Sequence, residues 1–310
     1  MAPIMSATAP SRPNGWIILD KPAGLGSTQA VTAVKRNLRE AGFGPKTKDL
    51  PKVGHGGTLD PLAQGVLPIA LGEATKLCGR MLDSDKTYEF TIKFGEETDT
   101  LDAEGKTVAT SEVLPALTEI EAILTRFTGP IEQMPPAYSA LKIDGKRAYD
   151  RARAGEDVAL KTRKVTIHSL EVTTAGSDLA TLTASVSKGT YIRSLARDIA
   201  RALGTVGHVT YLRRIKAGPF TLEKAISLDK LNEIGKGAAL EDVILPLEAG
   251  LDDIPALSLS PEAAAAVRQG RVLTGLPQGD GLYWAKAGET PVALMELTAG
   301  TAKVVRGFNL

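Results

Sequence analysis

A run rich in glycine and proline, residues 54–68, surrounds a single carboxylate, Asp60. Glycine permits unusual backbone angles and close approach by a ligand, and Pro61 pushes Asp60 toward an extended conformation. A carboxylate on such a constrained backbone is held in place before a substrate arrives. There it can act as a nucleophile or accept a proton. The structural alternative is an ordinary turn, since glycine, proline and aspartate are common turn residues.

The order of residues within this run resembles a known catalytic motif. The pattern His55-x-Gly57-x-Leu59-Asp60-Pro61-x-Ala63-x-Gly65-x-Leu67 is similar to that of the TruB-type tRNA pseudouridine-55 synthases, and the similarity continues through residues 72–76. Further blocks that resemble the same family are Lys86-Thr87-Tyr88 and residues 133–142, 188–195, 212–214 and 218–220. The resemblance covers about residues 15–225.

The resemblance implies that the protein isomerises a uridine of the tRNA T-loop to pseudouridine. This reaction breaks the N1–C1′ bond and remakes the bond at C5, so nothing is oxidised and no phosphate is spent. No cofactor is therefore expected, and the sequence contains no Walker A or dinucleotide-binding fingerprint. By the resemblance Asp60 is catalytic and Arg193 forms the ion pair that holds it. Tyr88 is expected to stack on the target base, and it can also remove the C5 proton.

The resemblance implies further residues that bind the substrate. Tyr191 and Leu212 are expected to complete the pocket for the base, and His55 to help displace the neighbours of the flipped-out base. Lys21 belongs to a motif that packs beside the catalytic loop, and it is expected to be one of the substrate-binding residues. By position alone, Tyr88 and Leu212 would be core residues and His55 a turn residue bonded to the backbone.

Charge is unevenly distributed along a chain whose net charge is only +1. Residues 142–216 contain 15 lysines and arginines against 7 acidic residues, whereas residues 95–132 contain 2 against 9. A basic segment in a near-neutral protein is typical of a localised site for a polyanion, and the alternative is a solvated charged surface. Residues 193, 197 and 201 follow helical spacing. Lys142, Arg197 and Arg201 are therefore expected to bind the tRNA backbone.

The composition sets the class of protein. The 310 residues are 43% apolar, which is enough for a sizeable core. One cysteine excludes an intrachain disulfide framework, and three histidines without zinc spacing make a metal site unexpected. The longest apolar runs are too short for a transmembrane helix, and residues 1–14 are interpreted as a disordered tail rather than a signal peptide. We expect a monomeric cytoplasmic protein without metal or membrane contact.

The pattern predicts an α+β fold: a mixed, mainly antiparallel central sheet flanked by helices and loops, the pseudouridine synthase fold that the resemblance implies. Strands are expected at 15–22, 86–94, 164–173 and 179–187, and helices at 27–41, from 118 and at 190–203. Ser27 or Thr28 is expected to cap the first helix, and Thr118 with Glu121 the second. Pro68 favours an edge or irregular position for its strand. A catalytic domain at 15–254 and a small C-terminal β-barrel-like module at 255–310, similar to the RNA-binding PUA domain, complete the predicted organisation.

The sequence also departs from the family pattern. Gly26 replaces a threonine, and Thr28-Gln29 replaces a common His-Asp pair, so helix capping and RNA contact near Ser27 are open to question. Two other functions remain as alternatives. One is a non-catalytic tRNA-binding or tRNA-folding protein, which would not need Asp60 together with Arg193. The other is a guide-RNA-dependent pseudouridylase of the dyskerin type, which the absence of long basic tails disfavours.

Overall fold

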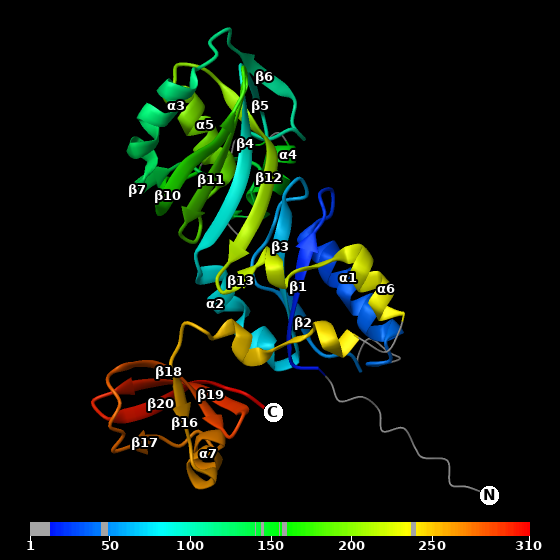
Figure 1. The fold of residues 1–310 in the computed structure, drawn as a ribbon, viewed down its shortest axis with the longest axis vertical. Coiled ribbons are helices and arrows are strands. Elements are labelled where there is room, and N and C mark those ends of the chain that lie inside the picture. The colour runs from blue at the N-terminus through cyan, green and yellow to red at the C-terminus, as the bar shows by residue number, and fades with distance from the viewer. Residues whose placement is uncertain are drawn as a thin grey trace, which may run out of the picture.

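Two β-sheets lie at opposite ends of the molecule (Figure 1). The computed structural model describes residues 13–44, 49–139, 141–143, 146–154, 156, 160–236 and 240–310. The larger sheet has eleven strands and includes strands from Gly15 to Pro246. The smaller has five and begins at Ala256.

The larger sheet is mixed and mainly antiparallel, as predicted. Its parallel pairs are β1 with β14 and β3 with β12. Its main path runs, in spatial order, through β14 (Ile226–Ser227), β1 (Gly15–Lys21), β3 (Gln64–Leu71), β12 (Gly207–Ala217), β4 (Lys86–Phe94), β11 (Leu179–Val186), β10 (Arg163–Ala175) and β7 (Gly129–Gln133). Three short strands join it at the side: β2 (Val53–His55), β13 (Phe220–Thr221) and β15 (Leu245–Pro246).

Helices pack their apolar sides against this sheet. In α5 (Ile192–Ala202) and α3 (Leu117–Leu124), the buried side chains join one core with those of β4 and β10. Figure 1 shows α1 (Ser27–Glu40) beside α6 (Leu228–Gly235), and Asn232 accepts hydrogen bonds from Arg36 and Asn37 across this pair. The remaining short elements here are α2 (Cys78–Asp83), α4 (Ala148–Arg153), the hairpins β5 (Glu96–Thr98) with β6 (Thr107–Thr110) and β8 (Lys142–Ile143) with β9 (Lys146–Arg147), and the 3-10 helices Gly72–Leu77, Thr125–Phe127, Leu222–Lys224, Leu240–Val243 and Leu247–Gly250.

Both predicted helix caps are wrong. Helix α1 has Gly26 as its N-cap, and the Gly26 amide donates to the side chain of Gln29 at 2.8 Å. Helix α3 has Ala116 as its N-cap, and the carboxylate of Glu119 accepts from the Ala116 amide at 2.7 Å. In each case a side chain at the third helical position satisfies the free backbone donor, so a hydroxyl at the cap is not required.

Pro68 lies inside the sheet rather than at an edge, at the irregular position where one side of β3 changes partner from β12 to β2. Strand β3 pairs with β1 on one side, where Pro68 is opposite Ile18, and with β2 on the other. The Pro68 carbonyl accepts from the Gly56 amide at 2.8 Å. Because the backbone nitrogen and oxygen of one strand residue face the same side, the missing proline donor faces the glycine-rich loop and breaks no bond to β1.

The C-terminal sheet has the strand order β16 (Ala256–Ser258), β18 (Gly281–Ala287), β19 (Thr290–Thr298), β20 (Thr301–Gly307) and β17 (Leu273–Thr274), with α7 (Pro261–Arg268) beside it. Strands β16 and β17 are its two edges, so the expected barrel is a half-barrel. Phe308 and Leu294 share a core cluster with Trp16 of the larger sheet. The Asn309 amide also donates to Glu73 at 2.7 Å, and Glu73 lies in the 3-10 helix that follows β3 of the larger sheet.

We expect Gly65→Ala to be much more destabilising than Gly129→Ala. Both glycines have positive φ, +100° and +91°, which costs an alanine about 1–2 kcal/mol. At Gly65 an added Cβ would also lie 2.2 Å from the Arg214 carbonyl oxygen, whereas no heavy atom lies within 4 Å at Gly129. The collision adds about 1–3 kcal/mol. Urea unfolding followed by circular dichroism measures the difference, and equal losses for the two variants would contradict it.

Candidate active site

Backbone hydrogen bonds hold the glycine-rich loop on both sides of Asp60. The Ser27 hydroxyl accepts from the Leu59 amide at 2.8 Å and donates to the Leu59 carbonyl at 3.0 Å. The Gly24 amide donates to the Pro61 carbonyl at 2.8 Å, and the Ala63 amide donates to that of Asp60 at 3.1 Å. The loop is therefore tied to the turn that precedes α1. Ser27 acts as this tie rather than as a helix cap.

Two buried cationic side chains, Arg214 and Lys21, donate hydrogen bonds to backbone carbonyls of the same loop. The guanidinium of Arg214, 1% exposed, donates to the carbonyls of Gly57 and Thr58 at 3.3 Å each and to that of Val66 at 2.7 Å. Lys21, 0% exposed, donates to the Pro61 carbonyl at 3.3 Å. Carbonyl dipoles replace part of the water that these cations lose on burial. The position of Asp60 thus depends on β1 and β12 as well as on its own loop.

Arg193 is the partner of Asp60, and it bridges to a second carboxylate. Its two terminal nitrogens lie 2.9 Å from Asp60 Oδ2 and 3.2 Å from Asp102 Oδ2. They also donate to the carbonyls of Thr100 at 2.8 Å and Tyr138 at 2.9 Å. Arg193 and Asp102 are buried, whereas the Asp60 side chain is 40% exposed. Among the described residues, Oδ1 of Asp60 has no hydrogen-bond partner, so that oxygen is left to meet a substrate.

A cavity of about 310 Å³ opens beside Asp60. Its floor is the sheet: Lys86 and Tyr88 of β4 lie next to Leu212 and Arg214 of β12, because Arg214 is paired with Tyr88 in register. One wall is the glycine-rich loop, and the other is the segment that leads into α5, from Ser187 to Arg193. The cavity is large enough for a single nucleotide base, and it carries three cationic side chains beside one carboxylate.

The comparisons identify the family. Residues 45–192 match the TruB family pseudouridylate synthase N-terminal domain, and residues 193–252 match the tRNA pseudouridylate synthase B C-terminal domain. The chain is 68% identical over 302 residues to tRNA pseudouridine synthase B of Novosphingobium aromaticivorans, covering 96% of this chain and 98% of the relative. It is 60% identical to the protein of that name from Zymomonas mobilis, covering 96% of each. This chain belongs to the TruB family of pseudouridylate synthases.

Solved structures agree with this assignment. The fold matches a chain of an H/ACA RNP bound to a substrate RNA containing 2′-deoxyuridine, with a TM-score of 0.71, 26% identity, and coverage of 96% of this chain and 85% of that one. It also matches a chain of a Cbf5–Nop10–Gar1 complex, with a TM-score of 0.70, 27% identity, and coverage of 96% and 84%. The TruB family chain therefore shares its architecture with these two less similar solved chains.

The structure brings five predicted site residues of this TruB family chain to one cavity: Asp60, Tyr88, Tyr191, Arg193 and Leu212. Tyr191 immediately precedes α5, and its backbone is clamped by the side chain of buried Gln133. The Gln133 amide oxygen accepts from the Tyr191 amide at 2.8 Å, and its nitrogen donates to the Tyr191 carbonyl at 3.1 Å. Burial raises the pKa of the Tyr191 hydroxyl above its usual value. Tyr191 is therefore a fixed, neutral wall at neutral pH.

Two predicted substrate-binding residues lie behind the site. Lys21 is fully buried, and its ammonium donates to the carbonyls of Pro22, Leu25 and Pro61. The prediction that it binds the substrate directly is therefore wrong. Its role is to position the loop. His55, at the end of β2, is half-buried and does not line the cavity. Burial and then the nearby Arg214 cation lower the pKa of His55, which makes the ring neutral at pH 7.

The predicted RNA-backbone residues are only partly presented to solvent. Arg197 donates to Asp198 at 2.8 Å and to the Met134 carbonyl at 3.1 Å, and its side chain is 11% exposed. Arg201 is 57% exposed and pairs with Glu97 at 2.9 Å. Arg193 faces inward, so the three arginines do not form one exposed face. The side chain of Lys142 lies outside the described residues. RNA contact by Lys142, Arg197 and Arg201 stays a prediction.

Several residues of the site were not found from the sequence. Asp102 lies in the acidic segment 95–132, where its backbone is bridged to Val209 of β12. Its neighbour Leu101 has φ of +63°, an angle that is uncommon for a residue other than glycine. Lys86 and Arg214 were noted only inside matching blocks. The sequence did show an excess of acidic residues in 95–132 and of basic residues in 142–216. That excess did not single out one aspartate.

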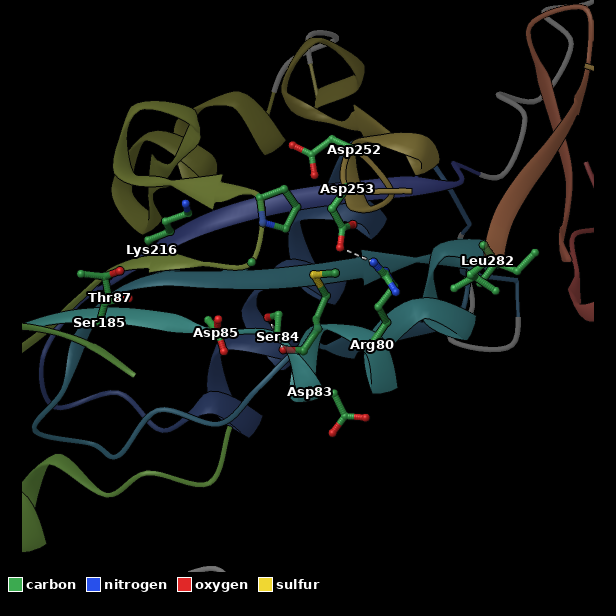
Figure 2. A pocket seen from close by; sticks show the side chains of 14 residues that line it. Arg80, Asp83, Ser84, Asp85, Thr87, Ser185, Lys216, Asp252, Asp253 and Leu282 are labelled. Carbon is green, nitrogen blue, oxygen red and sulfur yellow. Dashed lines mark hydrogen bonds and ion pairs between the residues drawn. The ribbon is translucent and has the colours of Figure 1, made fainter. Parts of the chain in front are cut away.

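A second cavity is larger, about 870 Å³, and lies between α2 and the C-terminal sheet (Figure 2). Figure 2 shows Arg80 paired with Asp253, and the lining also includes Lys216 and three further aspartates, residues 83, 85 and 252. Acidic groups outnumber basic ones, so this cavity repels phosphate, whereas the smaller cavity attracts it. Charge therefore makes the smaller cavity the better match to a polyanion.

Searches of the described residues for metal and membrane features gave two further findings. No group of three or more histidine, cysteine, aspartate or glutamate side chains in these residues could hold a metal ion. Within the same part of the chain, no helix combines the length and apolar character needed to cross a bilayer.

We expect Lys21→Met to remove a rise in stability at alkaline pH. Burial lowers the pKa of Lys21 to about 8 in the folded protein, whereas the unfolded value is about 10.4. Between these values the unfolded chain holds a proton that the folded protein has lost, so stability rises with pH by up to about 1.4 kcal/mol per pH unit. Urea unfolding from pH 7 to 10 should show that, above pH 8, the free energy of unfolding of wild type rises relative to that of Lys21→Met. Parallel profiles would contradict this, and the exposed Lys230→Met is the control.

Proposed function

We propose that this protein isomerises uridine 55 in the T-loop of tRNA to pseudouridine. The observation that carries the proposal is the state of Asp60. One of its oxygens is fixed by buried Arg193, and the other has no hydrogen-bond partner in the described part of the chain and lies beside a cavity of base size. A binding protein has no need of a half-exposed carboxylate held in this way, and RNA phosphates would be repelled by it. The arrangement is suited to a reaction at the sugar of one inserted nucleotide.

The reaction requires bond exchange at one sugar carbon. The N1–C1′ bond breaks and its electron pair stays on the uracil ring. The detached ring turns within the cavity, the C5–C1′ bond forms, C5 loses its proton and N1 gains one, so atoms and electrons balance. Asp60 is suited to two starting steps. It can attack C1′ as N1 leaves, and the resulting ester bond breaks when C5 bonds to C1′; or it can remove the C2′ proton as N1 leaves, and it returns that proton to C2′ when C5 bonds to C1′. In both, the Arg193 ion pair keeps the Asp60 side chain oriented.

The cavity walls support extrusion of the base. A uridine in a folded T-loop must leave its stack, which costs a few kcal/mol. Stacking on Tyr88 and contact with Leu212 and Tyr191 offset part of that cost. The Tyr88 hydroxyl is also proposed as the group that removes the C5 proton. His55, behind the loop, is proposed to help displace the bases next to the extruded one.

The remaining surface is proposed to hold the T-arm. Lys142, Arg197 and Arg201 would contact phosphates, and the C-terminal module, residues 255–310, would bind RNA as a PUA-like domain. The catalytic domain is proposed as residues 15–254, acting as a monomer in the cytoplasm without metal or cofactor. A guide-RNA-dependent enzyme is the second candidate, because the Cbf5-containing structures share the fold. The much higher identity to proteins named tRNA pseudouridine synthase B favours the stand-alone enzyme.

We expect Asp60→Asn to abolish tritium release from a tRNA transcript labelled at C5 of uridine. The amide keeps the shape of the carboxylate but can neither attack carbon nor accept a proton, so the rate should fall at least about 10³-fold. Asp229→Asn, a change at an exposed position on α6, is the matched control and should keep wild-type activity. An Asp60→Asn enzyme that releases tritium at the wild-type rate would refute the mechanism.

Two substitutions at Tyr88 should separate stacking from proton transfer. Tyr88→Phe keeps the ring, so KM should stay within about twofold while kcat falls by roughly 10²-fold or more, since the proposed base is missing. Tyr88→Leu also removes the stacking partner, which is worth about 1–3 kcal/mol, so KM should rise as well. Steady-state tritium release measures both constants. Full kcat in Tyr88→Phe would show that the hydroxyl is not the base.

A further inference from the structure

Arg163 is a cation beside the active-site cavity that the proposed chemistry does not use. It is the first residue of β10 and is half-buried. Its guanidinium carbon lies 5.8 Å from the centroid of the Tyr191 ring. A Cβ added to Gly189 would lie 3.3 Å from Arg163 Nη1. Because Gly189 and Tyr191 both line the cavity, the guanidinium lies directly at that wall.

The position of Arg163 is fixed by the sheet. Arg163 is paired in register with Gln133 of β7. Gln133 clamps the backbone of Tyr191, and Arg163 lies over its ring. Two residues paired across β7 and β10 therefore contact Tyr191, one at its backbone and the other at its ring. A guanidinium over an aromatic face keeps its N–H groups free at its rim.

Arg163 differs in its partners from the other arginines near the site. Arg193 holds two carboxylates, Arg214 holds three carbonyls, Arg197 and Arg201 pair with acidic side chains, and Arg213 pairs with Asp20 at 2.7 Å. Among the described residues, Arg163 has no hydrogen bond and no ion pair. A half-buried guanidinium whose five N–H donors bond to none of the described residues lacks an acceptor. An anion supplied by the substrate would complete it.

We propose that Arg163 binds a phosphate group next to the extruded uridine and so positions the RNA strand at the cavity mouth. This inference rests on the proposed function. When the base enters the cavity, the phosphates on its two sides must stay outside, because they are charged and joined to the rest of the RNA. A planar guanidinium grips a phosphate through two parallel hydrogen bonds. Arg163 is therefore a substrate-positioning residue, whereas Asp60 acts on the sugar.

A chemical double-mutant cycle tests this contact. Transcripts carry one uncharged methylphosphonate linkage, placed either 5′ or 3′ of the target uridine. For the wild-type enzyme, one of these linkages should raise KM about tenfold, the size of one charge-assisted hydrogen-bonded contact. Arg163→Gln should raise KM for the unmodified transcript by a similar factor, with kcat within about twofold. The two changes together should cost no more than either alone.

Salt dependence and a neighbouring charge provide the controls. Loss of one phosphate contact should reduce the slope of log Kd against log salt by about 0.7–0.9. Lys164→Gln removes an equal charge from the next residue of β10, whose side chain points to the opposite face of the strand. It should show no coupling to either methylphosphonate. Arg163→Lys keeps the charge without the planar fork, and it should raise KM less and retain partial coupling.

The outcomes separate the two proposals. If wild type releases no tritium from the transcript, the proposed function fails. If wild type is active and the effects of Arg163→Gln and each methylphosphonate multiply, the contact with phosphate is overturned while the function stands. If Arg163→Gln does not fold, Arg163→Lys takes its place in the same cycle, and independent effects there overturn the inference equally.

Discussion

The buried guanidinium of Arg193 is the interaction on which the site depends. It lies between Asp60 and Asp102 and uses two backbone carbonyls as well, so nearly all of its donors are occupied. A buried cation is costly unless it is paired, and two carboxylates with opposite exposure provide the pairing. Asp102 is sealed in the protein and acts as an anchor. Asp60 is half-open and keeps one oxygen for the substrate, so the same ion pair both stabilises the fold and prepares the reactive group.

A second constraint is the concentration of cations around one loop. Lys21, Lys86 and Arg214 are buried under or beside residues 57–61, and each is satisfied mainly by backbone carbonyls. Burial lowers the pKa of Lys21 and of Lys86 to about 8. The net charge of the chain is only +1, so composition conceals this local positive field. The field suits an RNA strand whose base enters the cavity while its phosphates stay at the mouth.

Much of the local structure could be predicted because it follows from short-range patterns. The alternation in β4 placed Tyr88 on the face of Phe90 and Ile92, and the apolar spacing of α5 gave its buried side. The errors came where tertiary contacts replaced the expected local partner. Ser27 holds Leu59 instead of capping its helix. Pro68 takes the irregular alternative rather than the edge, because its missing donor faces the loop. Lys21 was misjudged because a lysine next to a catalytic motif gives no sign that its ammonium is buried.

The sequence by itself determined the family, the candidate nucleophile and the partner arginine, because these are carried by ordered motifs of fixed residue type. Only the tertiary structure selected Asp102 among the acidic residues of its loop, and only the structure showed that Arg163 has no hydrogen bond or ion pair to any described residue. Both outcomes depend on strand register, which brings together residues separated by tens of positions. A linear sequence shows charge and periodicity. Which charged residues pair with one another depends on the strand register of the folded sheet.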